Sequence, residues 1–168
     1  MVIDAVRLLL FPSMMAFAAT SDLLTMTISN RVSLILVAGF CLLAATTGMD
    51  AATVGMHVGA AALVFAVVFF LFAMGWIGGG DAKLAAATAL WLGFDQLLTY
   101  FVWASLFGGV LTWLIIRFRL APLPNLLERE DWARRLHRMD AGVPYGIALA
   151  AAALVVYPDT LWMAVQGH

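Results

Sequence analysis

Two aspartates and a run of glycines carry the chemistry that this sequence can perform. Asp22 ends a long apolar segment, and Asp81 follows three consecutive glycines, Gly78, Gly79 and Gly80. Two carboxyl groups held close together share one proton, because both cannot readily ionise. The ionised member can activate a water molecule for attack on a peptide carbonyl, while the protonated member polarises that carbonyl. Asp22 and Asp81 are therefore candidate catalytic residues whose reaction needs no metal ion.

The elements that position these aspartates are predicted to be membrane-spanning helices. The 168-residue chain is 64% hydrophobic and 11% charged, whereas soluble domains are roughly half apolar and a quarter charged. A lipid bilayer can accept this apolar surface, and a soluble fold of this size cannot bury it. The sequence therefore predicts an all-α, polytopic membrane helix bundle that forms a single domain over residues 1–168.

Six transmembrane helices are predicted, at about residues 1–21, 32–48, 55–76, 81–93, 97–116 and 142–156. The fourth is the shortest, because the uncharged residues 84–93 rise only about 15 Å, half of a roughly 30 Å hydrocarbon core. Its helix is expected to begin earlier and to take Asp81 and Lys83 to the edge of the membrane. Trp91 and Trp162, near predicted span ends, are expected to be interfacial rings.

The distribution of basic residues predicts the orientation. Six crossings with the N-terminus outside place every Lys and Arg except Arg7 in the inner loops, in agreement with the positive-inside rule. Asp22 and Asp81 then lie at inner helix ends, at one membrane depth. A cleaved signal peptide is the alternative for residues 1–21, and Asp4 argues against it.

Residues 117–141 form the one sizeable polar segment and are predicted to be a cytoplasmic amphipathic loop. Asn125 and Glu128 have the spacing of a capping box, which predicts a short helix that begins there. The loop's arginines are expected to meet anionic lipid headgroups. Docking of a substrate is the alternative role for this loop.

The segment Gly78-x-Gly80-Asp81-x-Lys83 resembles the GxGD signature of the type IV prepilin peptidase family. Two further resemblances follow the same order along the chain. Residues 22–31 resemble the segment that holds the family's other aspartate, although Ser29 replaces the proline that usually precedes the equivalent of Asn30. Residues 143–148 resemble the motif that opens the family's last span. The resemblance thus covers nearly the whole chain.

The resemblance is closest to the short family members that serve Flp-type, tight-adherence pili. Longer members carry an insertion with paired CxxC motifs that binds zinc, whereas Cys41 is the single cysteine of this chain. No metal and no other cofactor is therefore expected, and a methyltransferase activity found in many longer members is not predicted.

The family resemblance implies an intramembrane aspartyl endopeptidase of the bacterial inner membrane. Its substrate is then the leader peptide of a prepilin or pseudopilin, cleaved at the cytoplasmic face, and its partners include membrane lipids but no nucleic acid. Asp22 and Asp81 take the catalytic roles. The expected substrate-binding or site-shaping residues are Asn30, Gly78, Gly79, Gly80 and Lys83, the glycines through unusual backbone angles and close approach of an extended peptide.

Two other classes of function stay open on the sequence. A proton-coupled transporter would use the two aspartates as a proton relay. A non-catalytic assembly partner of a pilus or secretion machine would tolerate their replacement by asparagine.

Overall fold

The computed structural model describes residues 2–164, which are helical with no strand. Four helices of this part of the chain are long and apolar enough to cross a membrane. They are α1 (Val2–Thr25), α2 (Asn30–Thr47), α3 (Ala51–Ala73) and α4 (Gly79–Leu120). The short helices α5 (Asp131–His137), α6 (Gly146–Val156), η1 (Tyr157–Asp159) and α7 (Leu161–Ala164) follow. The predicted all-helical class is confirmed, and the composition makes this an integral membrane protein.

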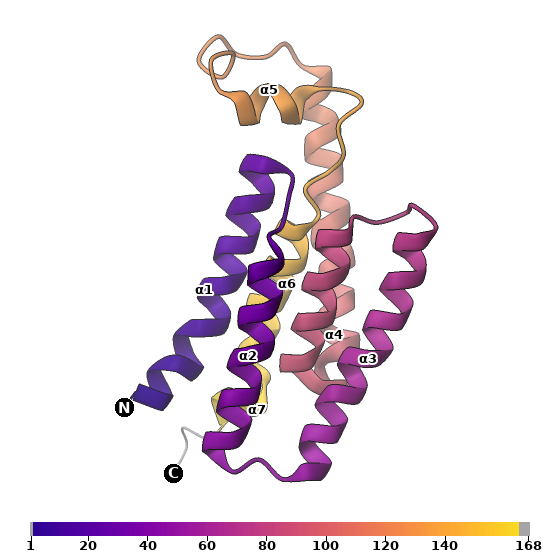
Figure 1. The fold of residues 1–168 in the computed structure, drawn as a ribbon. Helices are drawn as coiled ribbons and strands as arrows, with labels where there is room; N and C mark the ends of the chain where they lie inside the picture. The colour runs from indigo at the N-terminus through magenta and orange to yellow at the C-terminus, as the bar shows by residue number, and fades with distance from the viewer. Residues whose placement is uncertain (1, 165–168) are drawn as a thin grey trace.

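The long helix α4 is a hairpin of two helical arms (Figure 1). At Gly93 the backbone has φ 67° and ψ −177°, a region that is open almost only to glycine. The arms, residues 79–92 and 94–120, run antiparallel, so that Asp81 near the start of α4 and Thr112 near its end line one cavity. The predicted break at Gly93 is confirmed. Six crossings and an outside N-terminus stay predictions.

The reversal at Gly93 is held by side chains from other helices. A break in a helix leaves carbonyl groups without their usual partners. His57 Nδ1 lies 2.8 Å from the Leu90 carbonyl oxygen, and Trp162 Nε1 donates to the Trp91 carbonyl over 2.8 Å. Both side chains are buried, so the turn is fixed from inside the bundle.

An aromatic cluster, which we call the aromatic end, fills the bundle beside this turn. Its members are Phe11, Phe40, Trp91, Tyr157 and Trp162, each at most 3% exposed. Trp91 lies at the centre, with ring centroids 5.2 Å from Phe11 and 5.3 Å from Trp162. The prediction of interfacial positions for Trp91 and Trp162 is therefore wrong, because their indole N–H groups bond to internal carbonyls instead.

The polar loop between α4 and α6 is fastened to the opposite end of the bundle. The predicted helix start at Asn125 is wrong: residues 125–129 form turns, and α5 begins at Asp131. The Pro124 carbonyl accepts the N–H groups of both Leu127 and Glu128, which closes a turn before the helix. Arg135 of α5 donates to the Leu24 carbonyl at the end of α1 over 2.7 Å. The loop therefore covers the end of α1 that carries Asp22 (Figure 1).

Candidate active site

Asp22 lies in the last turn of α1 and is only 5% exposed. Its Oδ2 atom accepts the backbone N–H of Gly146 over 2.8 Å. Gly146 begins α6, and the first N–H groups of a helix have no partner within the helix. The carboxyl group of α1 thus satisfies a donor of α6 that lies 124 positions away in the chain.

Gly146 fits this contact because it has no side chain. A Cβ atom there would lie 2.8 Å from Asp22 Oδ2 and 2.6 Å from the Ile28 side chain, closer than real Cβ contacts. The glycine therefore lets the start of α6 approach the carboxyl group directly.

The loop that follows α1 turns sharply through Met26, the one described non-glycine residue with a positive φ, of 55°. Its N–H bonds to the Asp22 carbonyl over 2.8 Å, in the manner of a left-handed helix cap. Hydroxyl groups tie the loop further, as Ser21 Oγ donates to the Thr27 carbonyl over 2.9 Å. The turn brings Ile28 back against the start of α4.

Asp81 lies in the first turn of α4, after an N-cap at Gly78. The three glycines before Asp81 have ordinary backbone angles, and their missing side chains let neighbouring groups come close. None of them has a positive φ, which occurs instead at Gly75, Gly48 and Gly93. A Cβ on Gly80 would lie 3.1 Å from Ile28 Cβ, and one on Gly78 would lie 3.1 Å from Asp81 Oδ2. The prediction of unusual backbone angles for these glycines is therefore wrong, whereas close approach of a peptide to them stays a prediction. Gly80 lies against Ile28 of the α1–α2 loop, and Gly79 lies against Phe72 of α3.

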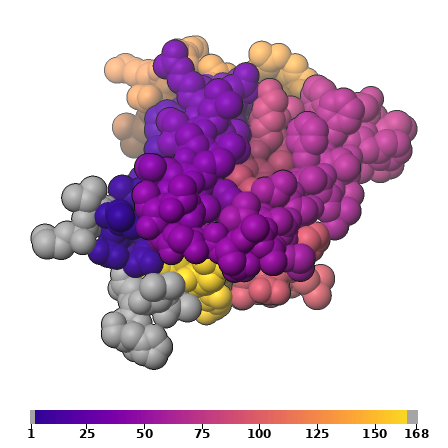
Figure 2. Space-filling view, turned by 60° about the horizontal axis from the view of Figure 1, so that its bottom comes forward, coloured from indigo at the N-terminus to yellow at the C-terminus, as the bar shows by residue number. Residues whose placement is uncertain are grey.

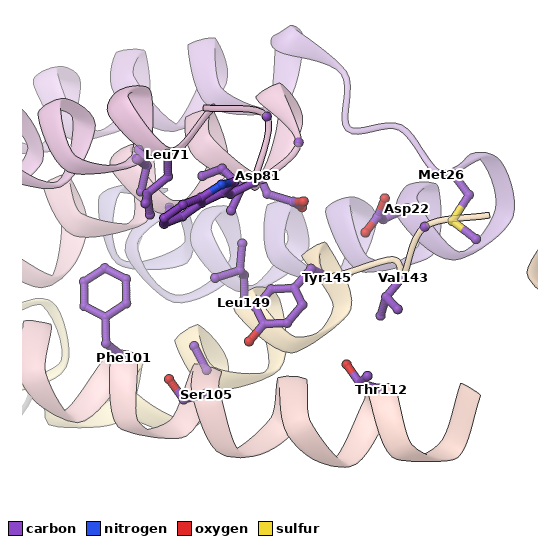
Figure 3. A pocket seen from close by; sticks show the side chains of 18 residues that line it. Asp22, Met26, Leu71, Asp81, Phe101, Ser105, Thr112, Val143, Tyr145 and Leu149 are labelled. Carbon is purple, nitrogen blue, oxygen red and sulfur yellow. The ribbon is translucent and has the colours of Figure 1, made fainter. Parts of the chain in front are cut away.

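The two aspartates line the same cavity, of about 880 Å³. The Asp81 side chain extends toward Asp22 (Figure 3). The cavity lies between the α3–α4 turn, the second arm of α4 and the start of α6. Its remaining wall is mostly apolar and includes Val68, Leu71, Trp76, Phe101, Ala104 and Leu149. The site is therefore a carboxyl pair at one end of an apolar cavity.

Lys83 and Asn30 contact each other and not the carboxyl pair. Lys83 Nζ donates to Asn30 Oδ1 over 2.8 Å, which joins the first turn of α4 to the first turn of α2. Among the described residues we find no ion pair between Lys83 and Asp81. The contact supports a site-shaping role for both residues, because it holds the two helix starts that flank the Asp22 loop.

The sequence missed several residues of the cavity wall. Tyr145, just before α6, lies within the segment already singled out at residues 143–148, and Leu149 of α6 lies just beyond it. Ser105 and Thr112, on the second arm of α4, face the cavity across from the aspartates (Figure 3). Nothing in a long apolar run marks these two positions, because their place depends on the hairpin. Within residues 2–164 no group of three or more His, Cys, Asp or Glu could hold a metal ion.

A family model described as the type IV leader peptidase family matches residues 9–113, which is more than half of the 168-residue chain. The matched region contains both Asp22 and Asp81, and it ends before the segment at residues 143–148. Comparison with curated proteins gives no match, and comparison with solved structures gives none either.

Proposed function

Because the chain belongs to the type IV leader peptidase family, we propose that it is an aspartyl endopeptidase with Asp22 and Asp81 as its catalytic pair. The observation that carries this proposal is the placement of both carboxyl groups in one cavity. They come from α1 and α4: Asp22 precedes the loop between α1 and α2, Asp81 follows the glycine turn, and Gly80 lies against Ile28 of that loop. The substrate is the leader peptide of a Flp-type prepilin or pseudopilin, cut at the cytoplasmic face of a bacterial inner membrane.

In the proposed reaction, one proton is shared by the pair. The ionised carboxylate takes a proton from water, whose oxygen attacks the scissile carbonyl carbon, while the protonated carboxyl donates to the carbonyl oxygen. The resulting tetrahedral diol collapses as the C–N bond breaks. The leaving amine takes the proton that the first carboxyl had received from water. One hydroxyl of the diol returns its proton to the other carboxylate as the C=O bond re-forms, and the new carboxylic acid keeps the water oxygen. The pair returns with one proton, so no metal or cofactor enters the cycle.

Asp22 and Asp81 have different surroundings, which suggest a different task for each carboxyl group. The Gly146 N–H occupies Oδ2 of Asp22, which leaves Oδ1 as the oxygen free to face water and substrate. This asymmetry favours Asp22 as the member that stays in one orientation. Asp81 is less buried than Asp22 and borders the glycine turn, where an extended peptide can approach the backbone.

The cavity also fits a peptide with an apolar part next to the scissile bond. Its aspartate end carries Gly78, Gly142 and Thr112, while Val68, Leu71 and Phe101 line the part further into the bundle. A polar leader would lie toward the loops and the apolar segment toward these side chains. The loop at residues 117–141 then borders the leader, and Arg135 is already engaged by the end of α1.

The proposal is tested by co-expression with a leader-bearing prepilin, followed by gel mobility of the pilin. We expect Asp22→Asn and Asp81→Asn each to lower the processing rate by at least about 10³-fold, within the usual range for loss of an acid–base group. Asp95→Asn is the matched control, because Asp95 is an exposed acid of the same helix that does not line the cavity. Normal processing by either dyad variant would refute the catalytic assignment. Intact pili assembled by both variants from unprocessed pilin would instead favour a non-catalytic assembly partner.

A further inference from the structure

A second hollow of the molecule lies on its lipid-facing side, away from the aspartates. Helices α2 and α3 follow each other in the chain, yet within the described residues they hardly touch, and each packs against α4. The space between them is a groove of about 360 Å³ whose floor is the first arm of α4. Figure 2 shows this hollow between the surfaces of α2 and α3, with atoms of α4 at its base.

The groove is lined by small and apolar side chains along most of its length. Val37 of α2, Ala62 and Phe65 of α3, and Ala86 of α4 are among them. Ala62 and Phe65 are exposed in the isolated chain, so that the hydrocarbon of the bilayer reaches the groove. Such an apolar groove between spanning helices can take one lipid acyl chain.

One end of the groove is polar and carries positive charge. Lys83 lines this end. Only one of the three N–H groups of the Lys83 ammonium donates to Asn30. Ser33 lies beside it, and its Oγ is buried with no hydrogen-bond partner among the described residues. Arg31 stands two positions before Ser33 and is exposed. Among the residues that the structure describes, no acidic side chain lines the groove, so its polar end suits an anion.

We propose that the groove between α2 and α3 binds one anionic phospholipid, with an acyl chain against Ala62 and Ala86 and its phosphate at Lys83 and Ser33. The phosphate oxygens would accept hydrogen bonds from the remaining N–H groups of Lys83 and from the unpartnered Ser33 hydroxyl, because each donor needs a partner at the edge of the membrane. Arg31 adds attraction to the negative headgroup, as a basic residue near an anionic membrane surface does.

The bound lipid would also brace the aspartate end. Lys83 is two positions from Asp81 and bonds to Asn30 at the start of α2. A phosphate on Lys83 and Ser33 would join α2 and α4 a second time at this depth. The lipid would thereby fill the gap that α2 and α3 leave open, without entering the catalytic cavity.

The test is native mass spectrometry of the full chain after exchange in micelles with equal amounts of phosphatidylglycerol and phosphatidylethanolamine. We expect one retained phosphatidylglycerol per chain. Ala62→Trp should remove it by filling the groove. Ala66→Trp is the matched control, because Ala66 is an exposed alanine one turn along α3 that does not line the groove, and it should retain the lipid.

Two charge variants test the headgroup without adding bulk. Lys83→Gln and Arg31→Gln should each lower the preference for phosphatidylglycerol by about fivefold, the ratio that corresponds to about 1 kcal/mol. Inorganic phosphate should not displace the lipid, because it lacks the acyl chain. Equal retention of both lipids, an unchanged preference in both charge variants, or unchanged binding by Ala62→Trp would overturn the proposal. A photoreactive group at position 62 that labels a protein segment in place of lipid would overturn it too.

Discussion

The interior around Gly93 is filled by aromatic rings, whereas the interior around Asp22 and Asp81 is hollow. At the aromatic end, Trp91 contacts Phe11, Tyr157 and Trp162, and its indole N–H bonds to the Leu36 carbonyl. At the aspartate end, a cavity of about 880 Å³ separates the second arm of α4 from the carboxyl pair. Both ends contain a glycine turn, but only the aromatic end is densely packed, whereas the aspartate end contains the cavity.

We infer from this contrast that the aromatic end mainly provides stability and the aspartate end mainly provides activity. Dense packing with satisfied hydrogen bonds contributes most to the free energy of unfolding, and the aromatic end has both. A cavity lowers stability, and carboxyl groups at membrane depth are costly, so such features persist where they serve function. We therefore expect substitutions at the aromatic end to unfold the protein and substitutions at the aspartate end to inactivate it.

The largest expected effect on stability is that of Trp91→Ala. Removal of this fully buried ring should lower the free energy of unfolding by about 3–5 kcal/mol through lost contacts and a new cavity. Trp76→Ala is the matched control, since Trp76 is 70% exposed and should leave stability nearly unchanged. Equilibrium unfolding in mixed micelles measures both. Equal effects for the two tryptophans would contradict the assignment of the packed core to the aromatic end.

At the aspartate end, Gly146→Ala should lower leader cleavage by about 100-fold, the cost of displacing a catalytic group by about an ångström. The added Cβ would press on Asp22 Oδ2 and on Ile28. Gly142→Ala serves as control, because Gly142 borders the same cavity but a Cβ there meets nothing within 4 Å. Rates of prepilin processing compare the two variants, and similar rates would remove Gly146 from the positioning of Asp22.

Gly93→Ala should lower the free energy of unfolding by about 1–3 kcal/mol, because only glycine readily adopts this φ and ψ. A Cβ at Gly93 would also lie 3.0 Å from the His57 ring. Gly109→Ala, in the helical second arm with open space around it, should be neutral or stabilising. Thermal unfolding distinguishes the two. A neutral Gly93→Ala would mean that the reversal of α4 does not require this backbone conformation.

The smallest effect is a pH dependence at the cap of α3. Hydrogen bonds from the Thr53 hydroxyl and N–H hold the pKa of Asp50 below its usual range. A depressed pKa in the folded state means that the stabilisation is present above the unfolded pKa, about 3.9, and is lost as the pH falls through the folded value. Asp50→Asn can still cap the helix, so its melting temperature should fall less than that of the parent upon acidification. Melting curves of the parent and of Asp50→Asn, each recorded in acid and at neutral pH, measure this difference.

Much of the architecture could be predicted from the sequence because it follows from local chemistry. Long apolar runs require helices in a bilayer, since no water satisfies exposed backbone groups there. The break at Gly93 and the presence of Asp22 and Asp81 at helix ends are local features of this kind. The helix predicted at Asn125 failed because a turn at Pro124 competes for the same N–H groups.

The sequence by itself determined that the chain is a helical membrane protein with two carboxyl groups near helix ends and a family signature around each. Only the tertiary structure decided what these groups touch. The bond from Gly146 to Asp22, the Lys83 contact with Asn30, and the burial of Trp91 and Trp162 each join distant segments. Such contacts depend on how helices pack, because a side chain's partner is set by the elements that surround it and not by its neighbours in the chain.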